Sequence, residues 1–172
     1  MMTVVTGGSK CGKSGYAEKI LDSFEGQKLY IAAMIPYGEE AEKAIERHRE
    51  MRKNKGFETV EKYTDIDEII LPKNCAVLLE CMGNLLANEM FRSGEITDPT
   101  DKILKGIESL KIQSQHLVIV TNNVSCDGID YEKGTLEYIR IMGRINRRMT
   151  EIADNVTECV YGIPLILKGQ LL

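Results

Sequence analysis

Apolar and polar residues alternate along this chain in blocks that predict strands and helices in turn. Short apolar runs rich in Val, Ile and Leu, bounded by Gly, Pro or charged residues, are typical of strands. Stretches with apolar residues three and four positions apart predict amphipathic helices. The predicted strands cover residues 2–6, 28–34, 57–61, 75–80, 116–121, 156–161 and 165–168. The predicted helices cover residues 14–24, 38–55, 65–70, 82–92, 102–112 and 134–154.

This order of elements predicts the fold class. Strands that alternate with helices form parallel βαβ units, and ligands then bind at the carboxyl ends of the strands. The composition, 43% hydrophobic and 28% charged residues, is ordinary for a globular protein, and 172 residues are enough for one full core. No repeat, low-complexity stretch or linker divides the chain. We therefore expect one α/β domain over residues 1–172, with three layers and a mostly parallel central sheet.

The most informative stretch follows the first strand, where residues 7–14 read GGSKCGKS and match G-x-x-x-x-G-K-[ST]. Glycines in such a loop are expected to take positive φ and to let the backbone approach a phosphate. The N–H groups at the start of the following helix bind anions. The lysine reaches the β- and γ-phosphates, and the last hydroxyl ligates Mg²⁺. The sequence thus predicts a P-loop NTPase fold whose phosphate-binding residues are Gly7, Gly8, Ser9, Lys10, Cys11, Gly12, Lys13 and Ser14.

Charge and cysteine content narrow the function classes. The net charge of −4 argues against a general nucleic-acid or membrane-surface binder. No apolar run approaches membrane-spanning length, and the first run is read as a strand rather than a signal peptide. Five cysteines without a C-x-x-C pair, together with two histidines, argue against a zinc site and indicate reduced thiols. We expect a cytoplasmic protein with no membrane span and no nucleic-acid partner.

Two residues outside the loop carry candidate chemistry. Glu80 ends the predicted strand 75–80, where P-loop enzymes hold a carboxylate that orients a metal or water, so Ser14 and Glu80 are the candidate Mg²⁺ ligands. His48 falls on the apolar face of the helix 38–55, among arginines at 47, 49 and 52. Positive neighbours lower a histidine pKa, and a neutral imidazole can attack phosphorus. From spacing alone, a structural core histidine stays open as the alternative.

Several longer segments together resemble one known family. They are VTGGSKCGKS, LYIAAM, IERHREMR, residues 57–61, VLLECMGNLLANEMF, IVTNNV and GRINRRMTEIADNVTECVYGIPLILKG. The phosphate loop alone occurs in many folds. The histidine helix, the LLEC segment and the ending G-x-I-N…AD…V-x-G-x-P are specific in combination. Over essentially its whole length, the chain resembles the bifunctional adenosylcobinamide kinase/adenosylcobinamide-phosphate guanylyltransferase of cobalamin biosynthesis.

The resemblance implies two reactions. ATP or GTP first phosphorylates the hydroxyl of the aminopropanol arm of adenosylcobinamide. GTP then transfers GMP onto that phosphate through a histidine–GMP intermediate, which gives adenosyl-GDP-cobinamide and pyrophosphate. The resemblance makes His48 the guanylylated residue, Mg²⁺ the cofactor and a homotrimer the assembly. Beyond the phosphate loop it assigns nucleotide contacts to Ala32, Ala33, Met34, Arg49, Glu50, Met51, Arg52, Glu61 and Glu80.

The chain departs from the family pattern at two places. Lys10 and Cys11 stand where the family usually has arginine and serine, and lysine lacks the planar bidentate fork of arginine. After the strand 116–121 the family usually reads T-N-E-V-G, whereas this chain has Asn123 in place of the acid and Ser125 in place of the glycine. If that acid positions the metal or the cobinamide hydroxyl, the kinase half is weakened.

Three alternatives to the full bifunctional reading stay open. The chain could be a guanylyltransferase with weakened kinase activity, or a monofunctional P-loop kinase of a small alcohol in which His48 is structural. A nucleotide-gated switch is the third, although the run after the strand 116–121 lacks the N-K-x-D of guanine switches. His116 is expected only to cap its strand, and Asn146 to anchor a loop. The corrinoid-binding residues are not predicted.

Overall fold

The computed structural model describes residues 1–124 and 131–170, with the backbone alone at positions 40, 41, 44, 48 and 51. Its strands are β1 (Met2–Thr6), β2 (Gln27–Ala32), β3 (Phe57–Glu61), β4 (Cys75–Glu80), β5 (His116–Val120), β6 (Asn155–Val160) and β7 (Ile163–Lys168). Its helices are α1 (Lys13–Ile20), α2 (Glu39–Arg52), the 3₁₀ turn η1 (Ile66–Glu68), α3 (Met82–Met90), α4 (Thr100–Gln113) and α5 (Lys133–Ile152). The predicted order of elements is confirmed.

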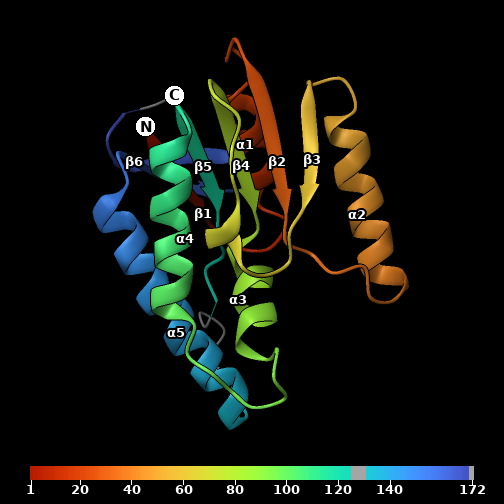
Figure 1. Ribbon diagram of the computed structural model, residues 1–172, viewed down its shortest axis with the longest axis vertical. Coiled ribbons are helices and arrows are strands. Elements are labelled where there is room, and N and C mark those ends of the chain that lie inside the picture. The colour runs from red at the N-terminus through yellow and green to blue at the C-terminus, as the bar shows by residue number, and fades with distance from the viewer. Residues whose placement is uncertain (125–130, 171–172) are drawn as a thin grey trace.

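The strands form one seven-stranded sheet in the order β3-β2-β4-β5-β1-β6-β7, and β7 is the one antiparallel strand in it (Figure 1). The strands 2–6, 57–61 and 75–80 have the predicted bounds. Helix α1 ends at Ile20 rather than at residue 24, because the next amides bond three residues back, Leu21 N to Glu18 O and Asp22 N to Lys19 O. Such i→i−3 bonds tighten and end a helix.

Three layers of secondary structure make up the core. Helices α3, α4 and α5 cover one face of the sheet, and α1 covers the other (Figure 1). The central strand β5 and its neighbour β4 are buried along their whole length, as their continuous apolar runs predict. Within β4, Val77 and Leu79 face α3, α4 and α5, whereas Ala76 and Leu78 pack with α1. The predicted three-layer α/β fold with a mostly parallel sheet is confirmed.

Helix α2 lies outside these layers, beside β3 at one edge of the sheet (Figure 1). The turn that follows its carboxyl-terminal end is joined to α1 through Lys55, whose Nζ lies 2.6 Å from Glu18 Oε2. The Glu18 side chain is completely buried, so this ion pair is screened little by solvent. Toward its amino-terminal end, the charged side chains of Glu39 and Lys43 pair with each other and are exposed. Lys55 thus joins the segment after α2 to the rest of the domain.

The opposite edge of the sheet is apolar and uncovered. Strand β7 pairs only with β6 among the described residues, and it exposes Ile163, Leu165 and Leu167. An exposed apolar edge strand is a surface that other protein chains can cover. Over residues 1–124 and 131–170, no helix combines the length and apolar character needed to cross a membrane.

Candidate active site

A cavity of ≈ 1040 Å³ opens at the carboxyl ends of the parallel strands, between the phosphate loop and α2. This is the edge where α/β proteins of this topology bind ligands. It gathers residues from the loop after β1, from β2, β3 and β4, from the segment after β5, and from α2. The predicted nucleotide-binding residues that line it are Ser9, Lys10, Cys11, Gly12, Lys13, Ser14, Ala32, Met34, Arg49, Arg52, Glu61 and Glu80.

The phosphate loop has the conformation that its glycines predict at two of three positions. Gly7 has φ 141° and Gly12 has φ 94°, and α1 begins directly after Gly12. The prediction for Gly8 is wrong, because Gly8 does not have positive φ and a Cβ there would meet nothing within 4 Å. Lys10 takes the left-handed conformation instead, with φ 56°. One of the positive-φ positions of the loop is therefore residue 10, which is not a glycine.

The turn between β6 and β7 supports the phosphate loop. The Gly162 N–H donates to the Cys11 carbonyl oxygen at 2.9 Å, and a Cβ on Gly12 would lie 3.3 Å from Gly162 Cα. A Cβ on Gly7 would lie only 2.5 Å from the Cys159 carbonyl oxygen. Glycine is thus required at position 7 for close approach as well as for its φ.

Lys13 lies inside the curve of the loop. Its side chain is nearly buried, at 7% exposure, and its Nζ donates to the Gly8 carbonyl oxygen at 2.5 Å. The Cys11 sulfur lies 3.8 Å from the same Nζ. The ammonium is therefore held over the loop, where the phosphates of a nucleotide bind in proteins with this motif.

Ser14 and Glu80 meet at the base of the cavity. The Ser14 hydroxyl donates to Glu80 Oε1, and the buried Tyr30 hydroxyl donates to Glu80 Oε2 at 3.0 Å. A hydroxyl and a carboxylate are hard oxygen donors, the kind that suits Mg²⁺ beside substrate phosphates. The predicted pair of Mg²⁺ ligands is thus brought together. Sequence reasoning missed Tyr30, although the two-residue period of β2 places it on the same side of the strand as Ala32.

The side of the cavity formed by α2 is basic. Arg52 is almost buried, at 6% exposure, and its Cζ lies 3.4 Å from the centre of the Tyr30 ring. Among the described residues its Nη1 has no hydrogen-bond partner. A buried guanidinium nitrogen without a partner is costly, so Arg52 fits an anionic ligand.

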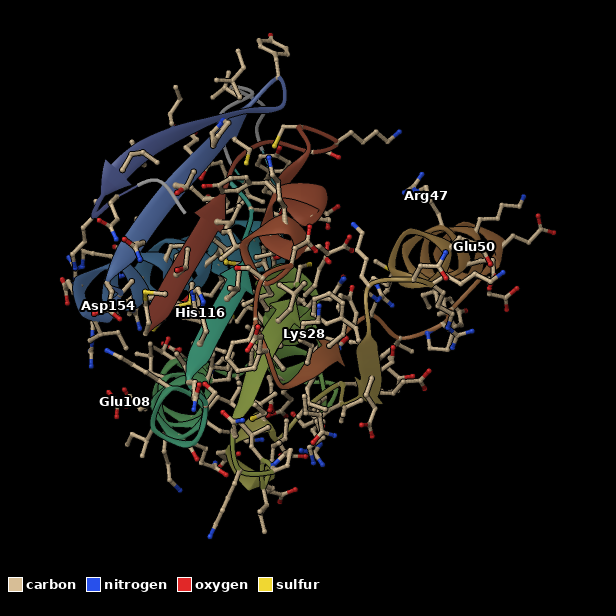
Figure 2. The ribbon with its side chains drawn as sticks, turned by 90° about the horizontal axis from the view of Figure 1, so that it is seen from above. Lys28, Arg47, Glu50, Glu108, His116 and Asp154 are labelled. Carbon is tan, nitrogen blue, oxygen red and sulfur yellow. The ribbon has the colours of Figure 1, made fainter. Side chains whose placement is uncertain are left out.

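Two further arginines of α2 line the cavity. Arg49 Nη2 lies 3.0 Å from Glu61 Oε1, and both side chains are half exposed. The Tyr63 hydroxyl donates to the other Glu61 oxygen at 2.9 Å. Arg47, which the site assignment did not include, also lines the cavity and projects from α2 in Figure 2. Arg47, Arg49 and Arg52 of α2 would therefore attract an anion into this cavity.

Four predicted nucleotide-binding residues that the structure describes do not line the cavity: Gly7, Gly8, Ala33 and Glu50. The Ala33 methyl is buried in the core on the face covered by α3, α4 and α5, because alternation along the chain turns it away from Ala32. Glu50 is exposed and pairs with Lys53 at 3.3 Å. The side chains of His48 and Met51 lie outside the described part of the structure.

His116 lies far from this cavity. It begins β5 and pairs in register with Ala76, whereas Glu80 is at the other end of β4. Its ring Nε2 is 3.0 Å from Thr3 Oγ1, and Figure 2 shows it near Asp154. Burial, with a smaller effect of the N-terminal amino group, lowers the pKa of His116 to about 4. A structural role therefore fits His116.

Asn146 also has a structural contact. Its side-chain oxygen accepts from Thr121 Oγ1 at 2.7 Å and so anchors the segment after β5, as predicted.

Asn123, the departure from the family pattern, lies beside an acid that the sequence reading did not consider. Its Nδ2 donates to Glu158 Oε1 at 2.8 Å, and its Oδ1 accepts from Thr6 Oγ1 at 2.9 Å. Glu158 lies on β6, directly opposite Thr6 in register. Asn123 also lines the cavity. A carboxylate is thus present next to position 123, while Ser125 lies outside the described residues.

Comparison with known proteins identifies relatives of full length. A family model described as cobinamide kinase / cobinamide phosphate guanyltransferase matches residues 3–167. The bifunctional adenosylcobalamin biosynthesis protein CobU of Escherichia coli (strain K12) is 32% identical, over 98% of this chain and 100% of the relative. The protein of the same description from Salmonella typhimurium (strain LT2) is 30% identical with the same coverage.

Solved structures give more distant matches. The P4 protein of bacteriophage phi6 in complex with ADP matches with a TM-score of 0.39 and 13% identity, over 95% of this chain and 52% of that one. A DnaB-like replicative helicase matches with a TM-score of 0.45 and 9% identity, over 96% of this chain and 54% of that one. The chain thus spans about half the length of each of these proteins.

The family match covers both the phosphate loop and the basic helix α2, which lie on opposite sides of one cavity. It also includes β6 and most of β7, whose connecting turn supports the loop. The phosphate-loop motif, the residues that line the cavity and the full-length relatives therefore all indicate the same family. The chain belongs to the cobinamide kinase / cobinamide phosphate guanyltransferase family, whose bifunctional enzymes act in cobalamin biosynthesis.

Proposed function

We propose that this enzyme phosphorylates the aminopropanol hydroxyl of adenosylcobinamide with ATP or GTP, and then transfers GMP from GTP through a covalent intermediate on His48. The observation that carries the proposal is the single cavity that joins the phosphate loop to the basic side of α2. The buried Arg52 guanidinium, with no partner for Nη1 among the described residues, supports an anion between them. Position 48 is one helical turn before Arg52 in α2.

In the kinase step, the substrate hydroxyl attacks the γ-phosphorus of the triphosphate and the nucleoside diphosphate leaves. Lys13 and the loop N–H groups hold the phosphates and offset the charge that develops on them. Ser14 and Glu80 would hold Mg²⁺, which when bound neutralises charge on the phosphate oxygens. The oxygen donors of these two side chains fit that ion.

In the transfer step, the neutral imidazole of His48 attacks the α-phosphorus of GTP. A phosphorus–nitrogen bond forms, the bond from the α-phosphorus to the bridging oxygen breaks, and pyrophosphate leaves. The phosphate of adenosylcobinamide phosphate then attacks the same phosphorus and releases the histidine. The guanidinium groups of Arg49 and Arg52 would stabilise the charge that develops on the transferred phosphoryl group.

Mass spectrometry after incubation with GTP and Mg²⁺ tests this proposal. We expect the protein to gain the mass of one guanylyl group, which is GMP less water, and the adduct to be labile in acid and stable in alkali, as a phosphoramidate is. A monofunctional kinase or a nucleotide-gated switch would form no covalent adduct. Absence of the adduct at saturating GTP would therefore refute the histidine–GMP step.

The residues around Asn123 predict how a substitution at this position changes the rate of the kinase reaction. An acid placed at position 123 alone would face the Glu158 carboxylate, and like charges at hydrogen-bond distance repel. We therefore expect Asn123→Glu to help only when combined with Glu158→Gln, which can donate to the new carboxylate. The double variant should raise kinase turnover by about tenfold or more without changing GMP transfer. Steady-state rates of both half-reactions measure this.

The single variants are the controls for this experiment. Glu158→Gln alone should leave both turnover rates close to those of the parent, because Asn123 keeps its bond to Thr6. A parent enzyme with a fast kinase step, and no gain in the double variant, would show that position 123 needs no acid. In that case Glu80 is the carboxylate that assists phosphoryl transfer.

The homotrimer stays a prediction. The exposed apolar side chains of β7 offer a surface that another copy of the chain could cover. Light scattering of the purified protein would measure its mass in solution, and a monomeric mass across the micromolar range would contradict the assembly.

A further inference from the structure

Tyr30 contacts two residues with proposed functions in the active site, Glu80 and Arg52. It lies on β2, is only 4% exposed, and is absent from the residues that the sequence assigns to catalysis or binding. Its hydroxyl donates to Glu80 Oε2 at 3.0 Å, on the side of the predicted Mg²⁺ ligands. Its ring face meets the Arg52 guanidinium, whose Cζ is 3.4 Å from the ring centre. One side chain thus links the end of β4 to the last turn of α2.

The contact with Glu80 fixes the direction of a carboxylate. One Glu80 oxygen accepts from Tyr30 and the other from Ser14, so the two donors set the plane of the carboxylate between them. The phenolic O–H is the donor of this hydrogen bond, because a carboxylate can only accept. The other Glu80 oxygen is thereby held beside Ser14, the second predicted Mg²⁺ ligand.

The contact with Tyr30 also holds the Arg52 guanidinium in place. A guanidinium over an aromatic face is attracted by the ring, and more so where both are shielded from water, as they are here. A guanidinium held over a ring can still donate hydrogen bonds from its nitrogens. Among the described residues Nη1 has no partner, so the ring presents Arg52 to the cavity rather than neutralising it.

We infer that Tyr30 is a positioning residue shared by the two reactions: its hydroxyl orients Glu80 for phosphoryl transfer, and its ring orients Arg52 for GMP transfer. This inference rests on the proposed function for the roles of Glu80 and Arg52. The competing explanation is that Tyr30 is an ordinary core residue. In that case its removal would lower stability alone, because Tyr30 belongs to the same core cluster as Leu78 and Val118.

Two substitutions separate the hydroxyl from the ring. Tyr30→Phe keeps the ring, so we expect GMP-adduct formation at saturating Mg²⁺ to stay within about twofold of the parent. Its kinase turnover should fall about tenfold, and the Mg²⁺ concentration for half-maximal kinase rate should rise about fivefold, because one hydrogen bond to a charged group is lost. Tyr30→Leu removes the ring as well and should also slow adduct formation by about tenfold.

Two control variants complete the design. Tyr16→Phe removes another buried tyrosine hydroxyl, one that has no hydrogen-bond partner among the described residues and does not line the cavity. It should change neither reaction and neither Mg²⁺ dependence. Glu80→Gln tests the coupling: adding Tyr30→Phe to it should cause no further loss of kinase turnover, since the two residues act as one unit.

The inference is overturned if Tyr30→Phe keeps the kinase turnover and Mg²⁺ dependence of the parent. It is also overturned if Tyr30→Leu lowers the melting temperature but leaves both reactions at parental rates. A different result, no adduct in the parent protein, would instead refute the proposed GMP transfer. The Mg²⁺ dependence of binding of a fluorescent GTP analogue to the Tyr30→Phe and parent proteins would then still decide whether Tyr30 orients Glu80.

Discussion

Replacing His48 by asparagine is expected to abolish the GMP adduct while phosphorylation of adenosylcobinamide continues. The substitution removes the proposed nucleophile, and losing a nucleophile typically costs at least about a thousandfold in rate. The kinase step uses the phosphate loop, which connects β1 to α1, and the Ser14–Glu80 pair, which lies on α1 and β4; none of these residues is on α2. Intact-mass spectrometry with GTP, and phosphate transfer from labelled ATP or GTP to adenosylcobinamide, measure the two outcomes.

A matched control for this variant is Glu39→Gln in the first turn of the same helix. Glu39 is exposed, pairs only with Lys43 among the described residues, and does not line the cavity. The control should form the adduct at the parental rate. An adduct that persists in His48→Asn would place the nucleophile on another residue. Loss of both activities in a folded His48→Asn protein would mean that position 48 belongs to a nucleotide-binding surface used by both reactions.

Lys13→Ala should weaken nucleotide binding by tenfold or more and reduce both activities together. A charge-assisted hydrogen bond to phosphate contributes about 1.5–3 kcal/mol, and at the transition state the same ammonium offsets further negative charge. The fold should barely change, because the contacts of Lys13 Nζ are to Gly8 and Cys11 of its own loop. Calorimetric titration with GTP and thermal unfolding measure affinity and stability.

Lys19→Ala removes an exposed lysine from the last turn of the same helix and serves as the comparison. It should bind GTP as the parent does, so a general effect of net charge would be visible as a loss in both variants. GTP affinity that is unaltered in Lys13→Ala would remove the phosphate-loop assignment altogether.

Much of the fold could be predicted because local sequence determines it. The runs MTVVT and CAVLLE are long enough, apolar enough and sharply enough bounded to define β1 and β4 without knowledge of their neighbours. The phosphate loop could be predicted for the same reason, since its fixed residues are consecutive. Even there, the sequence does not predict that Lys10 rather than Gly8 has positive φ, because nothing around Lys10 indicates a left-handed conformation.

The parts of the site that could not be predicted depend on pairs distant in sequence. Asn123 and Glu158 meet because β5 and β6 both flank β1, and no local pattern states that order. Tyr30 reads as one more apolar residue of β2 until Glu80 and Arg52 are placed around it. The attachment of α2 through Lys55 and Glu18 is of the same kind. Such contacts become apparent only with the three-dimensional arrangement of the sheet.

The support of the phosphate loop by the β6–β7 turn has a consequence for the order in which the enzyme is made. The loop, residues 7–14, is translated long before Cys159 and Gly162, against which it is held. Its contacts with those two residues cannot form until residues 159–162 have also left the ribosome. The phosphate loop is therefore translated early but acquires its working shape late.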